Sequence, residues 1–122
     1  MKDCIFCKIA NKEVESLTLY EDDILMVIMD ANPDCDGHTL VIPKKHYTDI
    51  TEVDNETLMH MFDIARKYAD IIMKKLNKSA VTYLINYGDS QLVKHLHLHI
   101  LPNFKREKPK MSREEVYNIL KG

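Results

Sequence analysis

Apolar and polar positions along the chain follow strand-like periods in its first third and again after residue 80. Five segments have the length and apolar content of strands, one of them a continuous apolar run and another a strict alternation. They cover residues 16–23, 24–30, 38–47, 80–86 and 92–102. Clustered Asn, Pro, Asp and Gly at 31–37 predict a loop between the second and third segments.

Helical periodicity dominates the middle of the chain. Apolar residues recur at intervals of four and three and form one stripe, which consists of Leu58, Met61, Phe62, Ile64, Ala65, Tyr68, Ala69, Ile72 and Leu76. Asp54 is a good N-cap for this helix, and Asn77 can end it in the left-handed conformation. Ser112 and Glu115 have the spacing of a capping box, which predicts a short last helix that ends at Lys121.

The order of these elements defines the expected fold class. Strands come first, a long helix follows, and further strands and a terminal helix close the chain; residues 4–13 predict one short helical turn at the start. No regular β-α-β alternation is present, which favours an α+β fold with a mainly antiparallel sheet of about five strands. The chain has 122 residues, of which 45% are hydrophobic. Residues 1–122 are therefore enough to form a single domain with one core.

Charge and cysteine usage exclude several classes of protein. The 17 basic and 19 acidic residues leave no basic surplus, which argues against nucleic acid as a partner. No apolar stretch has the length of a membrane span, and Asp3 and Lys8 make the N-terminus a poor signal peptide. We therefore expect a reducing cytoplasmic setting, in which Cys4 and Cys7 are metal ligands or plain thiols and Cys35 has no assigned role.

Three of the six histidines stand at alternate positions of one predicted strand. His95, His97 and His99 would share one face of it, while Leu96 and Leu98 point into the core. Three interpretations compete: a polar strand face, a metal site that needs further ligands, and nucleophilic catalysis by a neutral imidazole. The remaining motifs decide among them.

This run lies in "QLVKHLHLHILP" at 91–102, and three further motifs accompany it: "CIFCKI" at the start, "GHTLVIPKKH" at 37–46, and "NYGDSQ" at 86–91. With them the sequence resembles the histidine triad (HIT) family over nearly its whole length. The resemblance implies an α+β fold with a curved antiparallel sheet, usually in a homodimer that joins two sheets. It also implies hydrolysis or transfer of a nucleoside monophosphate from substrates that carry an α-phosphate.

The resemblance also assigns roles to individual residues. His97 would be the nucleophile that attacks the α-phosphorus, with His99 and His38 in support. The residues that would contact the nucleotide are Asn86, Gln91 and the backbone of Ser90 at the phosphate, Asp30 at the ribose, and Phe6, Ile9 and Ile28 at the base. A subset of the family holds zinc, and its ligands would map to Cys4, Cys7, His46 and His95. That zinc would be structural and would leave His97 free.

Two departures from the family pattern bear on the substrate. The turn at 86–91 is about two residues short, and Leu92 replaces a serine that phosphoramidase-type members often carry. The leading prediction is a nucleotidyl hydrolase that cleaves purine nucleotide derivatives such as AMP phosphoramidates. A dinucleoside polyphosphate hydrolase, a zinc-dependent hydrolase with the triad as metal ligands, and a nucleotide-binding dimer with little turnover stay open.

Overall fold

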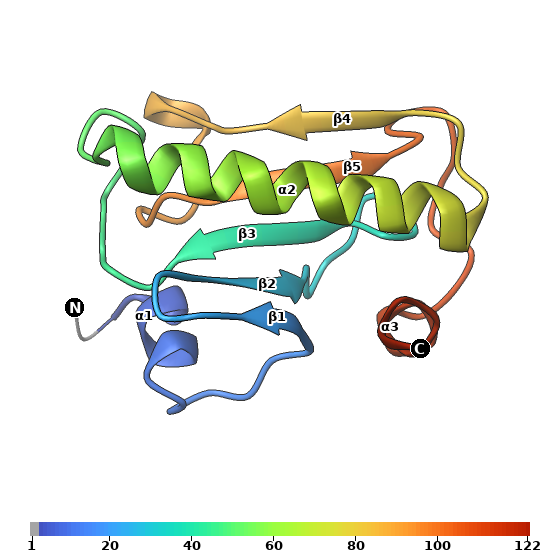
Figure 1. The fold of residues 1–122 in the computed structure, drawn as a ribbon, viewed down its shortest axis with the longest axis horizontal. Helices are drawn as coiled ribbons and strands as arrows, with labels where there is room; N and C mark the ends of the chain where they lie inside the picture. The colour runs from blue at the N-terminus through green and yellow to red at the C-terminus, as the bar shows by residue number, and fades with distance from the viewer. Residues whose placement is uncertain (1–2) are drawn as a thin grey trace.

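One antiparallel sheet and three α-helices make up the computed structural model, which describes residues 3–122. The strands are β1 (Thr18–Glu21), β2 (Leu25–Met29), β3 (Thr39–Pro43), β4 (Val81–Leu84) and β5 (Leu98–Pro102); the helices are α1 (Ile5–Ala10), α2 (Asn55–Leu76) and α3 (Arg113–Lys121), with a 3-10 turn η1 (Gly88–Ser90). The five strands run in the order β1-β2-β3-β5-β4 (Figure 1). This confirms the predicted α+β class, with its long helix and short C-terminal helix.

The two faces of the sheet are covered by different helices. Alternate residues of β2 point to opposite sides, so Leu25 and Val27 join the core under α2 whereas Met26 and Ile28 join a smaller core with Phe6 of α1. In Figure 1, α2 runs across the front of the sheet, and α3 lies at the end of β1, where it also contacts α2. The face opposite α2 therefore remains available for a site beside α1.

Both predicted helix caps on α2 and the capping box on α3 are confirmed. The Asp54 carboxylate accepts a hydrogen bond from the Thr57 N–H, and Asn77 ends α2 with a φ of 54°. One residue of the predicted apolar stripe is not buried: the Phe62 side chain is 38% exposed, whereas Met61 beside it is fully buried. Phe62 lies on the flank of the stripe, where the sheet does not cover it.

The predicted strand at 92–102 is only half formed, because β5 begins at Leu98. Its neighbour β3 ends at Pro43, which has no N–H to donate to a ladder. The Pro43 carbonyl does not pair with a backbone N–H of the ladder either, because it accepts a hydrogen bond from His95 Nε2 at 2.8 Å. His95 and His97 thus lie on an irregular segment just before the strand, and their positions depend on side-chain contacts.

Buried Asp36 fixes the loop between β2 and β3 to the C-terminal segment. Its carboxylate accepts hydrogen bonds from the N–H groups of Lys110 and Met111. Next to it Gly37 has a φ of +90°, and a Cβ there would lie 2.8 Å from Leu76 Cδ1, so only glycine fits this turn. These contacts hold the loop that leads into His38.

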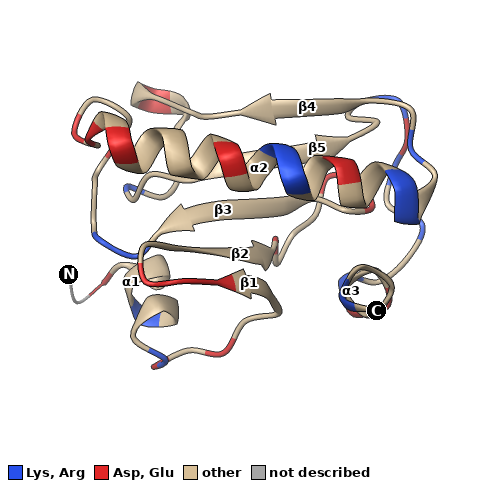
Figure 2. Ribbon diagram, viewed as in Figure 1, with Lys and Arg blue, Asp and Glu red and all other residues tan. Residues whose placement is uncertain are grey.

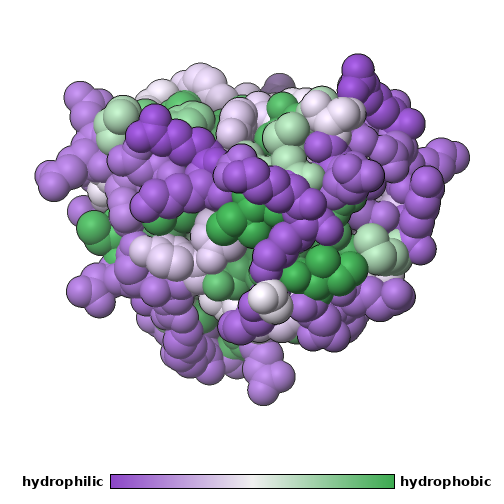
Figure 3. Space-filling model, turned by 45° about the vertical axis from the view of Figure 1, so that its right-hand side comes forward, coloured by the Kyte–Doolittle hydropathy of each residue, from purple (hydrophilic) through white to green (hydrophobic). Residues whose placement is uncertain are grey.

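Charges of both signs alternate along the outer face of α2 (Figure 2). Hydrophilic side chains dominate the face in Figure 3, interrupted by small hydrophobic patches. Within residues 3–122, no helix combines the length and the hydropathy that crossing a membrane requires.

Candidate active site and metal cluster

A cavity of about 640 Å³ opens on the face of the sheet opposite α2. It is lined by eight of the residues that the sequence assigned to catalysis or nucleotide binding: Phe6, Ile9, Ile28, Asp30, His38, Asn86, His97 and His99. They come from α1, β2, β5 and the segments that flank β2, β3, β4 and β5. The fold thus brings together residues that are up to 93 positions apart.

Two residues predicted to contact phosphate, Ser90 and Gln91, do not line this cavity. Ser90 is exposed, and its hydroxyl donates to the Tyr87 carbonyl. Gln91 is buried, and its Nε2 donates to the Thr48 carbonyl at 2.6 Å. In this arrangement the Gln91 amide anchors the short turn rather than facing His97. Phosphate contact by these two residues stays a prediction.

The hydrogen bonds of His97 define its tautomer. Nδ1 lies 2.8 Å from the main-chain carbonyl oxygen of His95. A carbonyl can only accept, so Nδ1 carries the proton, and in the neutral ring Nε2 keeps its lone pair. The ring also packs edge-on against Phe6, with centroids 5.0 Å apart. His97 therefore has a fixed ring and a basic nitrogen of the kind that attacks an electrophile.

A relay of hydrogen bonds fixes the other two histidines. The Asp34 N–H donates to His38 Nδ1 at 3.0 Å, so the neutral His38 ring carries its proton on Nε2. That Nε2 lies 2.9 Å from His99 Nδ1 and 3.3 Å from Asp30 Oδ2. His99 Nδ1 is therefore an acceptor, and its proton is on Nε2.

His99 Nε2 is buried and has no hydrogen-bond partner among the described residues. A buried donor without a partner costs on the order of 1–3 kcal/mol. His99 lines the same cavity as His97, and their ring centroids are 4.8 Å apart. An acceptor atom bound next to His97, such as a phosphate oxygen, would satisfy this donor.

Burial keeps these rings neutral. It lowers the pKa of His97, His38 and His99 below 6.5, and that of His99 to about 4 with a smaller contribution from neighbouring His97. Each ring is consequently uncharged near neutral pH. A neutral imidazole is the form required of a nucleophile.

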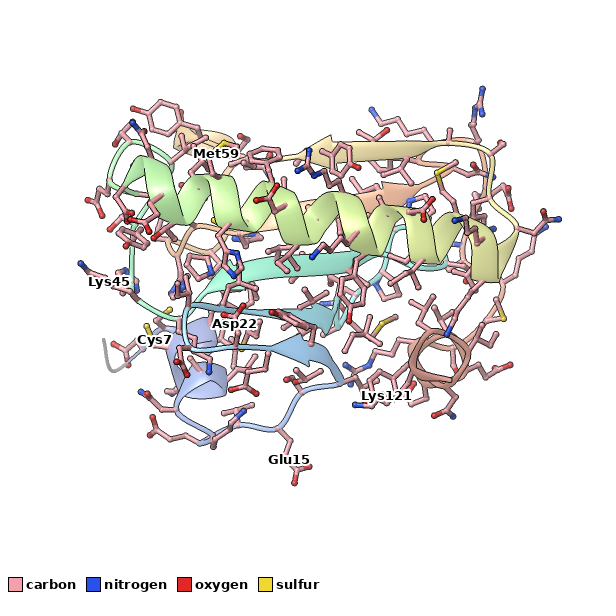
Figure 4. All side chains as sticks on the ribbon, in the orientation of Figure 1. Cys7, Glu15, Asp22, Lys45, Met59 and Lys121 are labelled. Carbon is pink, nitrogen blue, oxygen red and sulfur yellow. The ribbon has the colours of Figure 1, made fainter. Side chains whose placement is uncertain are left out.

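A second cluster lies beside the cavity. Cys4, Cys7, His46 and His95 present one ligand atom each, and these four atoms all lie within 4.8 Å of one another. His95 Nδ1 is 3.2 Å from Cys4 Sγ, and His46 Nδ1 is 3.3 Å from Cys7 Sγ. Cys7 lies within α1, near the start of the chain (Figure 4). The four predicted ligands are thus brought together and could hold a metal ion.

The chemistry of the donors fits a metal such as zinc. His95 donates its Nε2–H to the Pro43 carbonyl, so its other nitrogen is free as a ligand, an arrangement usual for metal-bound histidine. Burial and neighbouring Cys4 raise the pKa of the Cys7 thiol to about 11, so a cation is needed to make it a thiolate. Two thiolates and two imidazoles form a common tetrahedral zinc set.

His97 belongs to neither group of possible metal ligands in the described part of the chain. One group is the cysteine–histidine cluster, and the other consists of Asp30, His38 and His99. The arrangement thus favours the interpretation in which His97 is a free nucleophile over the one in which the triad binds a catalytic metal.

Fold and site together define an α+β protein that presents three histidines to a cavity on one face of a single antiparallel sheet. The chain belongs to the HIT domain family, which matches residues 11–106. It is 36% identical over 107 residues to the adenylylsulfatase HINT3 of Arabidopsis thaliana, an alignment that covers 86% of this chain and 54% of that protein.

Two solved structures share the fold. A Zn-bound histidine triad family protein from Mycobacterium smegmatis superposes with a TM-score of 0.90 at 32% identity, covering 98% of this chain and 91% of that one. A hypothetical histidine triad nucleotide-binding protein from Sulfolobus tokodaii superposes with a TM-score of 0.84 at 33% identity. The superposition covers 97% of this chain and 87% of that one.

Sequence reasoning missed three charged residues at the cavity, Glu15, Asp34 and Arg113. Asp34 fixes the His38 tautomer through its backbone N–H, and Arg113 reaches the cavity from the first residue of α3. The turn-rich stretch at 31–37 was a local signal for Asp34. No local sequence signal indicates that Arg113 lines the cavity. Its position there depends on the path of the C-terminal segment in the folded chain.

Proposed function

We propose that the protein is a nucleotidyl hydrolase that works through a covalent nucleotidyl–His97 intermediate. The observation that carries the proposal is the tautomer network, which leaves His97 Nε2 with a free lone pair in a cavity that the His99 ring also lines. The purine nucleoside would lie in the apolar slot of Phe6, Ile9 and Ile28, with its ribose hydroxyls on Asp30.

The proposed reaction has two steps. His97 Nε2 forms a bond to the α-phosphorus, the bond to the leaving group breaks with its electron pair, and the leaving atom takes a proton from solvent where it needs one. Water then attacks the phosphorus, the electron pair of the P–N bond returns to Nε2, and the proton of the water goes to solvent. His99 Nε2–H donates to a non-bridging oxygen, where negative charge develops.

Rapid quenching of the protein and labelled AMP phosphoramidate in alkaline denaturant, in which a P–N bond to histidine is stable, tests the proposal. We expect one nucleotidyl group per chain, on the peptide that contains His97, together with release of AMP. A protein that binds AMP but never becomes labelled would be a nucleotide-binding protein with little turnover instead. Labelling by dinucleoside polyphosphate alone would support the alternative hydrolase.

Zinc in the cysteine–histidine cluster is part of the proposal, supported by the donor set and by the zinc-bound relative. Bound zinc would neutralise two thiolates and cross-link α1 to the segments that carry His46 and His95. It would supply no group to the phosphorus, because none of its four ligands lines the cavity that holds His97.

The pKa shift of His97 predicts how the rate depends on pH. Burial lowers the pKa of His97 in the folded protein below 6.5, so the ring is mostly neutral near pH 7, and activity is lost as the pH falls through the lowered value. We expect a plot of log(kcat/KM) against pH to have its acid limb centred below 6.5. An acid limb at or above 6.5, measured with zinc content unchanged, would contradict this assignment.

We also propose a homodimer formed through β4 and the adjoining face of α2. In the described chain β4 pairs with β5 alone, so its other edge is free, and exposed Met59, Phe62 and Tyr83 flank it. Met59 projects from the first turns of α2 toward the side of β4 (Figure 4). A free strand edge beside exposed apolar side chains is suited to pairing with a second copy.

Substitution of Met59, which is 61% exposed, tests this interface. We expect Met59→Asp to raise the dimer dissociation constant at least about tenfold, because a buried apolar contact is replaced by a charge. Sedimentation equilibrium measures it, with Ile119→Asp on α3 as the matched control. Unchanged association of Met59→Asp would place the interface elsewhere.

A further inference from the structure

The cysteine–histidine cluster brings two thiols close enough to react with each other. The Sγ atoms of Cys4 and Cys7 lie within 4.8 Å of one another, and the Cys7 N–H donates to Cys4 Sγ. Residues three positions apart on a helical turn have Cβ atoms about 5–6 Å apart, whereas a disulfide needs about 4 Å. A small movement of the first turn of α1 would therefore join them.

The two thiols differ in their access to solvent. An open hollow of about 560 Å³ lies beside the cluster, and in the described chain Cys4 and His46 line it while Cys7 does not. Cys4 is partly exposed, whereas Cys7 is only 9% exposed. A small reagent in solvent consequently meets the Cys4 sulfur before the Cys7 sulfur.

The third cysteine provides an internal reference. Cys35 lies in the loop between β2 and β3, outside the cluster, and is 1% exposed. Burial, with a smaller contribution from the Asp34 carboxylate, raises the pKa of its thiol to about 12. A buried thiol that stays protonated does not react with oxidants, so Cys35 should remain reduced.

Both sulfurs of the cluster would be thiolates when zinc is bound, because zinc binds cysteine in its deprotonated form. The thiolate is also the form that oxidants attack. A disulfide would remove two of the four ligands and leave only His46 and His95, too few for tetrahedral zinc. Oxidation of the pair and loss of zinc are thus one event.

We infer that Cys4 and Cys7 form a redox switch that responds to hydroperoxides, with Cys4 reacting first and Cys7 completing the disulfide. This inference rests on the zinc that the proposed function assigns to the cluster. The Cys4 sulfur bonds to the terminal oxygen of the hydroperoxide, and the O–O bond breaks with its electron pair on the other oxygen, which takes a proton. The Cys7 thiolate then attacks the Cys4 sulfur, the S–O bond breaks, and hydroxide leaves as water after taking a proton. Two electrons pass from the thiolates to the hydroperoxide.

Phe6 connects this switch to the nucleotide cavity. It stands between the two cysteines on α1, and its ring contacts both His95 of the cluster and His97 of the cavity. The disulfide moves the first turn of α1 and releases His95 from the metal, so the wall that Phe6 supplies is no longer held in place. A hydroperoxide therefore lowers the affinity for nucleotide, and a reducing thiol with zinc restores it.

Titration of the zinc-loaded protein with hydrogen peroxide tests the redox switch. We expect zinc release to parallel the loss of two of the three thiols, and peptide mapping to show a Cys4–Cys7 disulfide. The affinity for AMP should fall at least about fivefold, the lower end of usual coupling between two sites. Dithiothreitol with zinc should reverse all three changes. Dimedone, which traps sulfenic acid, should label Cys4 and not Cys7.

Cys35→Ala is the matched control, because it removes a thiol outside the cluster; it should respond to peroxide as the parent protein does. The switch is overturned if zinc stays bound under peroxide, if Cys35 enters the disulfide, if dimedone labels Cys7 first, or if the affinity for AMP does not follow zinc release. A protein that takes up no zinc before oxidation contradicts the proposed metal as well, and one that binds no AMP before oxidation contradicts the proposed nucleotide chemistry.

Discussion

His97→Ala is expected to lower kcat/KM for an AMP phosphoramidate by at least about 10⁴-fold, the loss typical when a covalent nucleophile is removed. The loss is expected because the attacking atom is Nε2 of His97. Its lone pair is free in the cavity, since the proton of the ring is on Nδ1 and is donated to the His95 carbonyl. No other described ring can take over, since the relay commits His38 and His99 to proton-bearing Nε2 atoms. Quenched reactions of the variant should contain no nucleotidyl protein.

The fold should survive this substitution. The His97 ring lines a cavity and contacts the smaller core through Phe6, so AMP binding and the thermal melt should change little. His60→Ala is a matched control, because His60 lies on α2, pairs with Asp22 at 2.7 Å and is remote from the cavity lining. If His97→Ala retains turnover while His60→Ala loses it, the assignment of the nucleophile is wrong.

Local signals made most of the fold predictable. The caps Asp54 and Asn77, and the Ser112–Glu115 box, each involve residues within a few positions of one another, so the sequence alone contains the whole interaction. Within the apolar run at 24–30, residues 25–29 likewise form a fully buried strand, whereas Ile24 before it is exposed. Where a structure depends on neighbours in sequence, pattern and propensity suffice.

The parts that sequence could not supply depend on distant partners. The start of β5 depends on Pro43, whose carbonyl is bound by a ring 52 positions away. The pairing of His38 with His99 spans 61 positions, and the Gln91 amide is bound by a carbonyl at Thr48. The resemblance indicated which residues gather at the cavity, whereas tautomers and the orientation of Gln91 require the folded backbone.

Removal of zinc is expected to destabilise the protein and to weaken nucleotide binding together. Helix α1 has only six residues, too few to be stable alone, and Cys4 and Cys7 at its start would be two of the four ligands. A metal at about 1,000 times its dissociation constant stabilises by about 4 kcal/mol, which corresponds to roughly 10–20 °C in a chain of this length. Calorimetry of zinc-loaded and chelator-treated protein measures this shift.

Nucleotide binding should weaken because one short helix supplies both sites. Phe6 lies between the two cysteines, and its ring contacts both His95 and His97, at centroid distances of 5.7 and 5.0 Å. Loss of the metal would therefore release Phe6, which forms a wall of the base slot. Because coupling between two binding sites is reciprocal, bound AMP should raise the affinity for zinc by the same factor as bound zinc raises the affinity for AMP. Cys7→Ser should reproduce the effect of the chelator, while Cys35→Ala, which lies outside the cluster, should keep both affinities. Equal AMP affinity with and without zinc would mean that the core on this face of the sheet holds α1 unaided.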